Sequence, residues 1–368
     1  MDAKDPVLAR LVEQVGSAQA HRTPLDIRGG GTKRFYGGVP AGEPVDITDL
    51  SGITSYEPTE LVVTARAGTL LRDLEAALAE QGQCLPFEPP RFAAGGTVGG
   101  MVAAGLSGPA RASVGSVRDH VLGMTLLNGR AEVLTFGGQV AKNVAGYDVS
   151  RLIVGSLGIL GIICEVSIKV LPVSVATATL RFDWDETHAL RQLCGWRAQP
   201  LPINASAWHG GRLHLRLAGA QAAVEAACKA LGGERVEPSQ ANTWWTGVRD
   251  QSEDFFSLRA ASEAPGESIS ESIWRLSVPA TSGVIALPGE QFIEWHGALR
   301  WWKTGAEAAQ VRDAANRVGG HATLMRGADR SAGAFAPLSE VLMRVHQGLK
   351  EAFDPERIFN PGRLYAGL

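Results

Sequence analysis

The sequence predicts an α+β protein with a glycine-rich first domain and a smaller, antiparallel second domain. Its 368 residues suffice for two domains of roughly 100–200 residues each. Residues 1–173 hold 25 of the 44 glycines and no tryptophan, whereas all nine tryptophans lie between Trp184 and Trp302. This shift in composition places a boundary near Pro172. We therefore predict domains at 1–173 and 174–337, followed by a C-terminal segment at 338–368.

The first domain alternates predicted helices and strands. Asp5-Pro6 starts a helix that runs to about residue 20, because proline is favoured at the first helical position. Leucines 70, 71, 74 and 78 share one face of a second helix, predicted over 70–81 and stopped by Gly82. Aliphatic and β-branched runs predict strands at 25–28, 61–65, 122–127, 132–136 and 162–171.

The second domain shows a strand–helix–strand–strand–helix order. Strands are predicted at 177–182, 205–209 and 212–217, and helices at 186–192 and 221–231. Gly210-Gly211 between two of these strands is a two-residue hairpin signal. The order recurs from residue 273, with strands at 292–295, 299–302 and 321–325 and a helix at 306–318. The pattern predicts an antiparallel sheet of split βαβ type with helices on one face, and an amphipathic helix follows at 338–353.

Charge, hydropathy and cysteine content exclude several classes of protein. The formal net charge is −3, with 35 basic against 38 acidic residues, so no electrostatic footprint for nucleic acid is present. No run approaches the roughly 20 apolar residues of a membrane helix, and the start does not read as a signal peptide. These two observations predict a cytoplasmic chain. Cys84, Cys164, Cys194 and Cys228 are far apart, so we predict no metal site, iron–sulfur cluster or disulfide framework.

The glycine clusters are the main chemical signal. Arg28-Gly29-Gly30-Gly31-Thr32-Lys33 follows a predicted strand directly. Consecutive glycines expose backbone N–H groups that can form an anion-binding nest, here flanked by two cations. This pattern favours a pyrophosphate cradle, and a flexible loop is the alternative.

Three further clusters follow along the chain. They are Gly95-Gly96-Thr97-Val98-Gly99-Gly100, then residues 108–119, then Gly155-Ser156-Leu157-Gly158-Ile159-Leu160-Gly161-Ile162. Small side chains would let a planar ligand lie against the backbone, and close helix packing is the alternative. The chain holds neither a GxxxxGK[ST] P-loop nor a GxGxxG fingerprint, so a dinucleotide would be bound by a different architecture.

The order of these clusters, closed by Phe359-Asn360-Pro361-Gly362, resembles the flavoprotein family that includes vanillyl-alcohol oxidase, D-lactate dehydrogenase and the glycolate oxidase subunits. The resemblance implies a PCMH-type FAD-binding domain of two α+β subdomains, covered by a smaller α+β cap domain. It also implies that the C-terminal segment returns to the FAD domain. The implied cofactor-binding residues are Arg28, Gly29, Gly30, Gly31, Thr32, Lys33, Gly95, Gly96, Thr97, Gly99, Gly100, Gly115, Arg118, Asp119, Gly161, Ile162 and Asn360.

The chain departs from the family pattern in two ways that bear on chemistry. Members with covalent flavin carry a histidine in the first glycine loop, where this chain has Gly30, Gly31 and Thr32, so the resemblance implies noncovalent FAD. The GDGNxH segment that holds a metal and the catalytic base in the family's hydroxy-acid dehydrogenases is absent. Among the second-domain histidines, His296 is our candidate base, because histidine titrates near working pH.

Two pairs of adjacent tryptophans, Trp244-Trp245 and Trp301-Trp302, are interpreted as strand residues. Adjacent strand side chains point to opposite faces, so we expect one of each pair to be exposed or covered by a partner. A place in the core or over the flavin is the alternative.

The leading hypothesis is an FAD-binding subunit of a glycolate (2-hydroxy-acid) oxidase complex. The resemblance implies two partners, a catalytic flavoprotein homologue and an iron–sulfur subunit, with membrane contact only through them. A self-sufficient FAD-dependent dehydrogenase and an assembly subunit with a vestigial flavin site are the alternatives.

Overall fold

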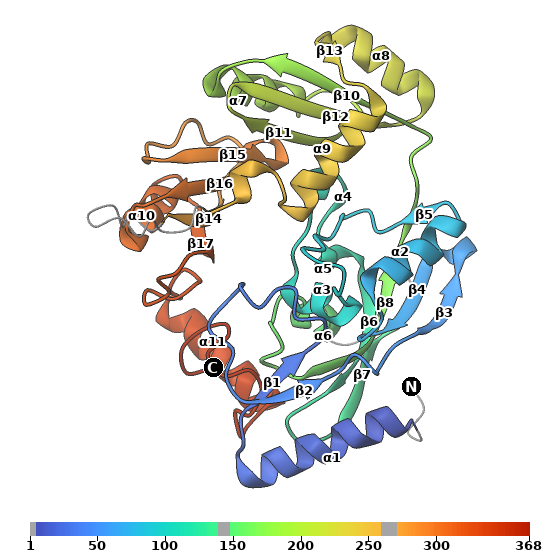
Figure 1. Cartoon of the computed structure of the whole chain (residues 1–368), viewed down its shortest axis with the longest axis vertical. Coiled ribbons are helices and arrows are strands. Elements are labelled where there is room, and N and C mark those ends of the chain that lie inside the picture. The colour runs from blue at the N-terminus through green and yellow to red at the C-terminus, as the bar shows by residue number, and fades with distance from the viewer. Residues whose placement is uncertain (1–4, 139–147, 259–270) are drawn as a thin grey trace. The chain divides into compact units, whose positions relative to one another are not determined.

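The computed structural model describes residues 5–138, 148–258 and 271–368 of the chain (Figure 1). Its contacts divide the chain into two compact units. The first unit comprises Met1–Leu106, Ser116–Pro172 and Pro337–Leu368, and the second comprises Ser107–Gly115 and Val173–Ala336. The predicted boundaries place residues 107–115 in the first domain, but this segment packs within the second unit. There the Ser113 hydroxyl donates to the Ile203 carbonyl at 2.9 Å, and the Trp295 Nε1 donates to the Gly108 carbonyl at 3.0 Å.

The first unit is built around a five-stranded antiparallel sheet with the order β3-β4-β8-β6-β7. Its strands are β1 (Leu25–Arg28), β2 (Glu43–Asp46), β3 (Ile53–Glu57), β4 (Val62–Arg66), β5 (Gln83–Cys84), β6 (Val121–Leu127), β7 (Val133–Gly137), β8 (Ile162–Lys169) and β9 (Leu171–Pro172). Its helices are α1 (Pro6–His21), η1 (Pro58–Glu60), α2 (Leu71–Glu80), α3 (Val98–Ala104), α5 (Val117–His120), α6 (Val149–Ile153) and α11 (Glu340–Phe353). All seven residues of β6 are buried, which explains why Thr125 is their only polar side chain.

A second, two-stranded sheet brings distant parts of the first unit together. β1 pairs in parallel with β2, and Leu25 forms a parallel bridge with Phe359. The Leu25 N–H donates to the Ile358 carbonyl at 2.7 Å, and the Asn360 N–H donates to the Leu25 carbonyl at 2.9 Å. The C-terminal segment therefore extends this sheet beside the strand that leads into the first glycine loop.

The second unit contains an eight-stranded antiparallel sheet with the order β13-β10-β12-β11-β15-β16-β14-β17. Its strands are β10 (Ala176–Asp183), β11 (Ile203–His209), β12 (Arg212–Gly219), β13 (Glu234–Arg235), β14 (Ser272–Ser277), β15 (Glu290–Glu294), β16 (Leu299–Thr304) and β17 (His321–Arg326). Its helices are α4 (Arg111–Val114), α7 (Glu186–Trp196), α8 (Gln221–Leu231), α9 (Pro238–Asp250), η2 (Asp254–Phe256), η3 (Trp295–Gly297) and α10 (Ala308–Arg317).

The first half of this sheet is a split βαβ motif. Its elements follow the order β10-α7-β11-β12-α8-β13, and Gly210 and Gly211 both take positive φ in the hairpin between β11 and β12. The second half repeats the strand order without a counterpart of α7. The predicted antiparallel sheet with helices on one face is observed for α7, α8 and α10, whose apolar sides share buried clusters with Leu180, Leu215 and Trp302.

The expectation for the paired tryptophans is wrong in two respects. Trp244 and Trp245 lie on α9, which packs against the opposite sheet face through the 3.0 Å hydrogen bond from Trp245 Nε1 to Thr179 Oγ1. Trp301 and Trp302 do lie on a strand, β16, but both are buried within the chain. One packs on Phe256 and the other belongs to the cluster under α10, because this sheet is covered on both faces at that point.

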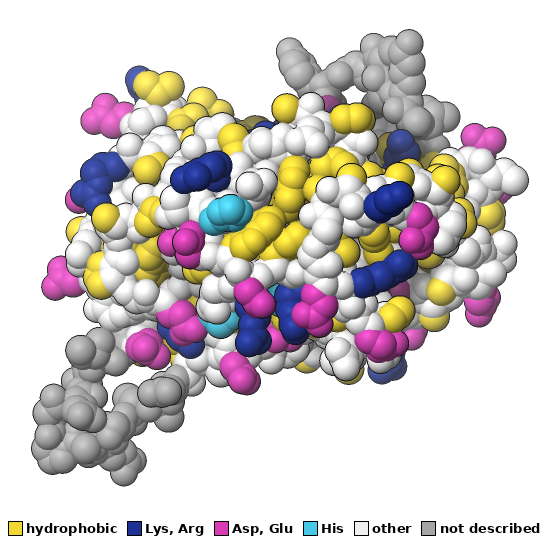
Figure 2. Space-filling view, turned by 90° about the horizontal axis from the view of Figure 1, so that it is seen from above, with side chains coloured by type: hydrophobic (Ala, Val, Ile, Leu, Met, Phe, Trp, Pro, Cys, Tyr) yellow, Lys and Arg dark blue, Asp and Glu magenta, His cyan; other side chains and the backbone are white. Residues whose placement is uncertain are grey.

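The surface carries charges of both signs. Figure 2 shows one face of the molecule, on which hydrophobic side chains gather along a hollow and acidic and basic side chains are mixed around it. Such mixing leaves no single-sign patch on this face for a polyanion. In the part of the chain that the structure describes, no helix is long and apolar enough to cross a membrane.

Candidate cofactor site

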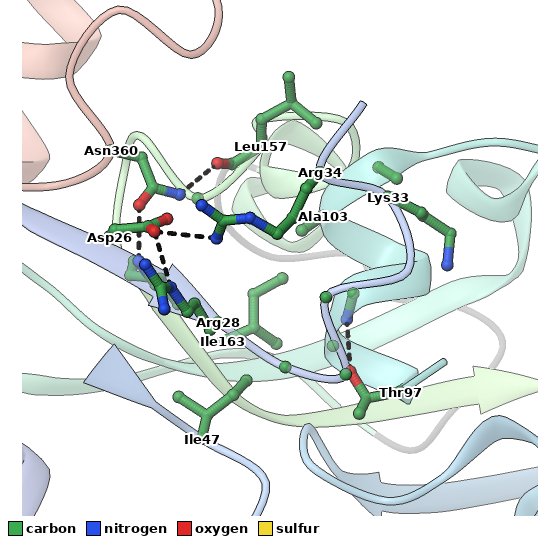
Figure 3. A pocket seen from close by; sticks show the side chains of 18 of the residues that line it. Asp26, Arg28, Lys33, Arg34, Ile47, Thr97, Ala103, Leu157, Ile163 and Asn360 are labelled. Carbon is green, nitrogen blue, oxygen red and sulfur yellow. Dashed lines mark hydrogen bonds and ion pairs between the residues drawn. The ribbon is translucent and has the colours of Figure 1, made fainter. Parts of the chain in front are cut away.

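The site begins where β1 runs into the first glycine loop. Asp26, buried in β1, accepts hydrogen bonds at its Oδ2 from Arg28 Nε at 2.7 Å and Arg34 Nη1 at 3.0 Å. Figure 3 shows both guanidinium groups gathered about this carboxylate, with Lys33 lying apart from them. Two cations share one anion here, so the loop keeps a net positive charge facing the pocket.

The glycine loop presents unused backbone donors. Among the described residues, the N–H groups of Gly29, Gly30, Gly31 and Thr32 have no acceptor in the chain. Gly29 and Thr32 are half-buried and Gly30 and Gly31 are exposed, so these donors stay open to a ligand, and four successive ones lining a pocket form a nest for an anion. Gly31 has φ of +67°, a conformation that a residue with a β-carbon rarely adopts.

A second loop packs against the back of the first. A β-carbon on Gly30 would overlap the carbonyl oxygen of Gly95, and one on Gly29 would overlap Oγ1 of Thr97. Thr97 is the N-cap of α3, and its Oγ1 accepts from the Gly100 N–H at 3.2 Å. Glycines are therefore needed in these two loops because the loop backbones contact each other, as well as to give a ligand access. Helix α3 contributes the small residues Gly99, Gly100 and Ala103 to the pocket wall.

The third wall of the pocket comes from the fourth glycine cluster and the C-terminal turn. Asn360 Oδ1 accepts from the Ile27 N–H at 2.7 Å, and its Nδ2 donates to the Leu157 carbonyl at 2.7 Å (Figure 3). A β-carbon on Gly158 would lie 2.6 Å from that Nδ2, so only glycine lets the amide approach. Arg363 donates to the carbonyls of Tyr36 and Gly38, which fixes the chain after the first loop.

The structure places the residues implied by the resemblance in three groups. Eleven of them line one pocket: Arg28, Gly29, Gly30, Gly31, Thr32, Lys33, Thr97, Gly99, Gly100, Gly161 and Asn360. Gly95 and Gly96 support the first loop from behind, and Ile162 is fully buried in β8 and faces the core. Gly115, Arg118 and Asp119 do not line this pocket, and Asp119 instead accepts from the N–H of Ser116, the N-cap of α5, at 2.7 Å as the N3 residue of a capping box.

Sequence reasoning missed several residues of this pocket. Asp26, Arg34 and Arg363 line it and carry its charge balance, and Leu157 and Gly158 complete the wall. Asp26 could have been identified from the sequence, because it is an acidic residue inside a short predicted strand. A carboxylate that is buried there requires a cationic or hydrogen-bonding partner. Arg363 stands directly after the Asn-Pro-Gly turn, but nothing local indicates that its carbonyl partners lie 325 or more residues earlier.

The candidate base His296 lies in the second unit. Trp295, His296 and Gly297 all have positive φ, and the His296 N–H donates to Ser206 Oγ at 2.9 Å. Its Nδ1 is buried and has no hydrogen-bond partner among the described residues. Burial, reinforced by the charge of Arg197, lowers the pKa of His296 to about 4, so the imidazole is neutral at pH 7.

The described residues form no group of three or more histidine, cysteine, aspartate or glutamate side chains able to hold a metal ion. The four cysteines are all free thiols at separate places.

The pocket fits a dinucleotide that carries a pyrophosphate. It offers four amides with no acceptor among the described residues and an excess of positive charge. It is lined by glycines at which an added β-carbon would clash with neighbouring atoms.

Residues 8–137 match the FAD-binding domain family, and the protein is accordingly a flavoprotein of the PCMH-type fold class. The chain is 47% identical to glycolate oxidase subunit GlcE of Escherichia coli over 358 residues, which is 97% of each protein. It belongs to the family of that subunit.

Two further comparisons extend this result. Glycolate oxidase subunit GlcD of Bacillus subtilis is 30% identical over 174 residues, 47% of this chain and 37% of that protein. Among solved structures, alkyldihydroxyacetonephosphate synthase matches with a TM-score of 0.64 at 15% identity, over 96% of this chain and 74% of that one. The last comparison shows a shared fold over 96% of this chain, and it shows nothing about cofactor or substrate.

Proposed function

We propose that this chain is the FAD-binding subunit of a complex that oxidises glycolate or a similar small 2-hydroxy acid. One observation carries the proposal: four successive backbone amides with no acceptor among the described residues line a pocket, in a chain that matches glycolate oxidase subunit GlcE over nearly its whole length. The chemistry that bound FAD supplies is acceptance of hydride from a carbon that bears a hydroxyl group.

The chain's own residues would hold the cofactor by complementary charge and shape. The amides of Gly29, Gly30, Gly31 and Thr32 would bind the pyrophosphate, with Arg28 and Arg34 balancing its charge beside Asp26. The small residues of α3 would admit a planar ring system against the backbone. Contacts from Gly115, Arg118 and Asp119 have no counterpart in this pocket wall and are not part of the proposal.

The proposal includes noncovalent attachment. The described residues that line the pocket include no histidine, cysteine or tyrosine, the side chains suited to forming a covalent bond with the cofactor. Denaturation in acid should therefore release free FAD into the supernatant. Flavin that stays with the precipitated chain would contradict this part of the proposal.

The proposed partners follow from the relatives and from the cysteines. A GlcD-like flavoprotein would be the main catalytic subunit. Because the four free cysteines lie apart, electrons would leave through an iron–sulfur partner, and any contact with a membrane would be made by such partners.

A second candidate function is independent oxidation of a hydroxy acid with His296 as the base. The buried Nδ1, which has no hydrogen-bond partner among the described residues, favours it because this nitrogen is available to accept the hydroxyl proton, whereas a pKa of about 4 makes it a weaker base than an ordinary histidine. In that case His296→Gln would slow the rate at which glycolate reduces the flavin by about 100-fold or more. The control is His209→Gln: His209 lies in the same unit and pairs with Glu290, and its substitution would leave that rate unchanged.

The deciding experiment is an absorbance spectrum of the purified chain, followed by anaerobic addition of glycolate. We expect flavin absorbance near 450 nm, little bleaching by glycolate alone, and bleaching once the GlcD-like and iron–sulfur subunits are added. Bleaching of the isolated chain would establish the second candidate. A colourless chain that takes up no added FAD would refute both and leave an assembly role.

A further inference from the structure

Lys350 occupies an unusual position for a lysine. It lies on α11, whose other residues are half-buried or exposed, yet the Lys350 side chain has no exposed surface. Lysine is among the residues least often fully buried, because removing an ammonium group from water is costly unless it is fully paired. The burial of this one charge therefore requires a structural or functional explanation.

All three donors of the Lys350 ammonium group are used. Nζ lies 2.7 Å from the Ile159 carbonyl, 2.9 Å from the Phe359 carbonyl and 2.8 Å from Asp354 Oδ2. An ammonium group has three donors and no acceptor, so its hydrogen bonding is complete. Burial lowers the pKa of Lys350, and the charge of Asp354 opposes that shift.

Asp354, the partner of Lys350, shapes the turn that follows α11. Its side chain is also fully buried, and its carboxylate accepts from the Ile358 N–H at 3.1 Å and the Phe359 N–H at 2.8 Å. A β-carbon on Gly129 would lie 2.5 Å from Oδ1, so the carboxylate is enclosed on that side as well. The buried pair thus fixes the path of the chain from the end of α11 to Phe359.

Both carbonyls that Lys350 holds belong to segments that continue into the cofactor pocket. Ile159 lies between Gly158 and Gly161, which line the pocket, and Phe359 precedes Asn360, which lines it too. Asn360 in turn joins the Ile27 N–H to the Leu157 carbonyl. Lys350 itself does not line the pocket and stands one layer behind its wall.

We propose that Lys350 is a positioning residue for the flavin site: with Asp354 it holds the 157–161 loop and the 358–360 turn at the spacing that the bound cofactor requires. This inference rests on the proposed FAD site. It implies that docking of α11 and cofactor binding are coupled, since the same ammonium group serves both.

The test measures FAD affinity and apoprotein stability separately. Lys350→Met keeps an unbranched side chain, one atom shorter, and removes the charge and all three donors. We expect its FAD dissociation constant to rise about 10-fold or more, as for other residues that orient ligand-binding groups from behind. The matched control is Leu11→Ala, a fully buried core substitution on α1 in the same unit at a residue that does not line the pocket. It should lower the melting temperature of the apoprotein and leave the FAD dissociation constant within twofold.

A second variant separates positioning from general stability. In Lys350→Met with Asp354→Asn, no unpaired carboxylate remains buried, so the apoprotein should regain stability relative to the single variant. The carbonyls of Ile159 and Phe359 would still lack their donor, so weak FAD binding should persist. Hydrogen exchange in the apoprotein should be faster at 157–161 and 358–362 in both variants than in Leu11→Ala.

The outcomes distinguish the two claims. If the unsubstituted chain binds FAD and either Lys350 variant binds it within twofold as tightly, the inference is overturned and the proposed function stands. If Leu11→Ala weakens FAD binding as much for the same loss of melting temperature, Lys350 contributes only general stability and the inference is likewise overturned. Failure of the unsubstituted chain to bind FAD would overturn the proposed function itself.

Discussion

The two units of the chain use opposite means to build their interiors. The first unit is rich in glycine, and its pocket is walled by loops whose backbones approach one another where a side chain would not fit. The second unit holds all nine tryptophans, and its sheet is packed by aromatic side chains such as Phe255, Phe292 and Trp301. The first unit exposes main-chain groups to a ligand, and the second unit packs aromatic side chains into its core.

This difference makes the units separable by spectroscopy. Intrinsic tryptophan fluorescence reports only on the second unit, and flavin absorbance reports on the pocket of the first. Substitutions in each unit should move one signal without the other, unless binding in the first unit depends on the second.

The largest effect is expected for Gly30→Val. Its β-carbon would overlap the Gly95 carbonyl oxygen, and a backbone neighbour cannot move aside, so the two loops would be forced apart. We expect purified Gly30→Val to retain no flavin, while its tryptophan emission spectrum matches that of the unsubstituted chain. Gly348→Ala is the matched control, because nothing lies within 4 Å of a β-carbon there, and it should keep full flavin content.

A smaller loss is expected for Asn360→Ala. The substitution removes the acceptor of the Ile27 N–H and the donor to the Leu157 carbonyl, and an unsatisfied buried group costs about 1–3 kcal/mol. FAD affinity, measured by quenching of flavin fluorescence, should fall roughly 10-fold. Asn316→Ala, an exposed position on α10, should bind FAD normally, and an unchanged affinity in Asn360→Ala would show that the bridge between the two segments is dispensable.

An acid-sensitive step is expected in the second unit. Burial, assisted by Arg181 and Arg212, lowers the pKa of His214 to about 4 from an ordinary value of 6.5. Between about pH 6.5 and 4, His214 therefore binds a proton in the unfolded chain but not in the folded chain. The free energy of unfolding falls as the pH drops through this range.

His214→Phe should remove the contribution of this histidine and keep the ring stacked on Trp244. In urea unfolding followed by tryptophan fluorescence, its stability should decline less steeply below pH 6.5, by up to about 1.4 kcal/mol per pH unit. Parallel pH dependences of the variant and the unsubstituted chain would show that His214 is not protonated on unfolding. His296, whose pKa burial also lowers to about 4, should act in the same direction.

The smallest effect is expected for Arg10→Met in the first unit. Its ion pair with Asp49 spans 3.0 Å, but the two side chains are 55% and 65% exposed, so water screens the attraction. The free energy of unfolding should change by less than about 0.5 kcal/mol, with flavin content unaltered. A larger loss would mean that this exposed pair contributes to the packing of α1.

Much of the fold was predictable because its signals are local. The leucines of α2, the apolar runs of β6 and β8 and the glycine hairpin between β11 and β12 each set a conformation through their own residues. Helix α9 was missed because Pro238–Asp250 carries polar residues among its aromatics, and its position is decided by Trp245 meeting Thr179 across the sheet. The segment at 107–115 was assigned to the wrong unit because Gly108 and Ser113 find their partners only in the folded chain.

By itself, the sequence determined that successive glycines after β1 would leave main-chain amides free, since absence of a side chain acts at the residue where it occurs. It also determined the alternation of strands and helices in both units. Only the tertiary structure decided that Asn360 would join β1 to Leu157 and that Lys350 would be buried against the Ile159 carbonyl. Those outcomes depend on groups that lie up to 333 residues apart in the chain, and no local property of a residue specifies a partner at that separation.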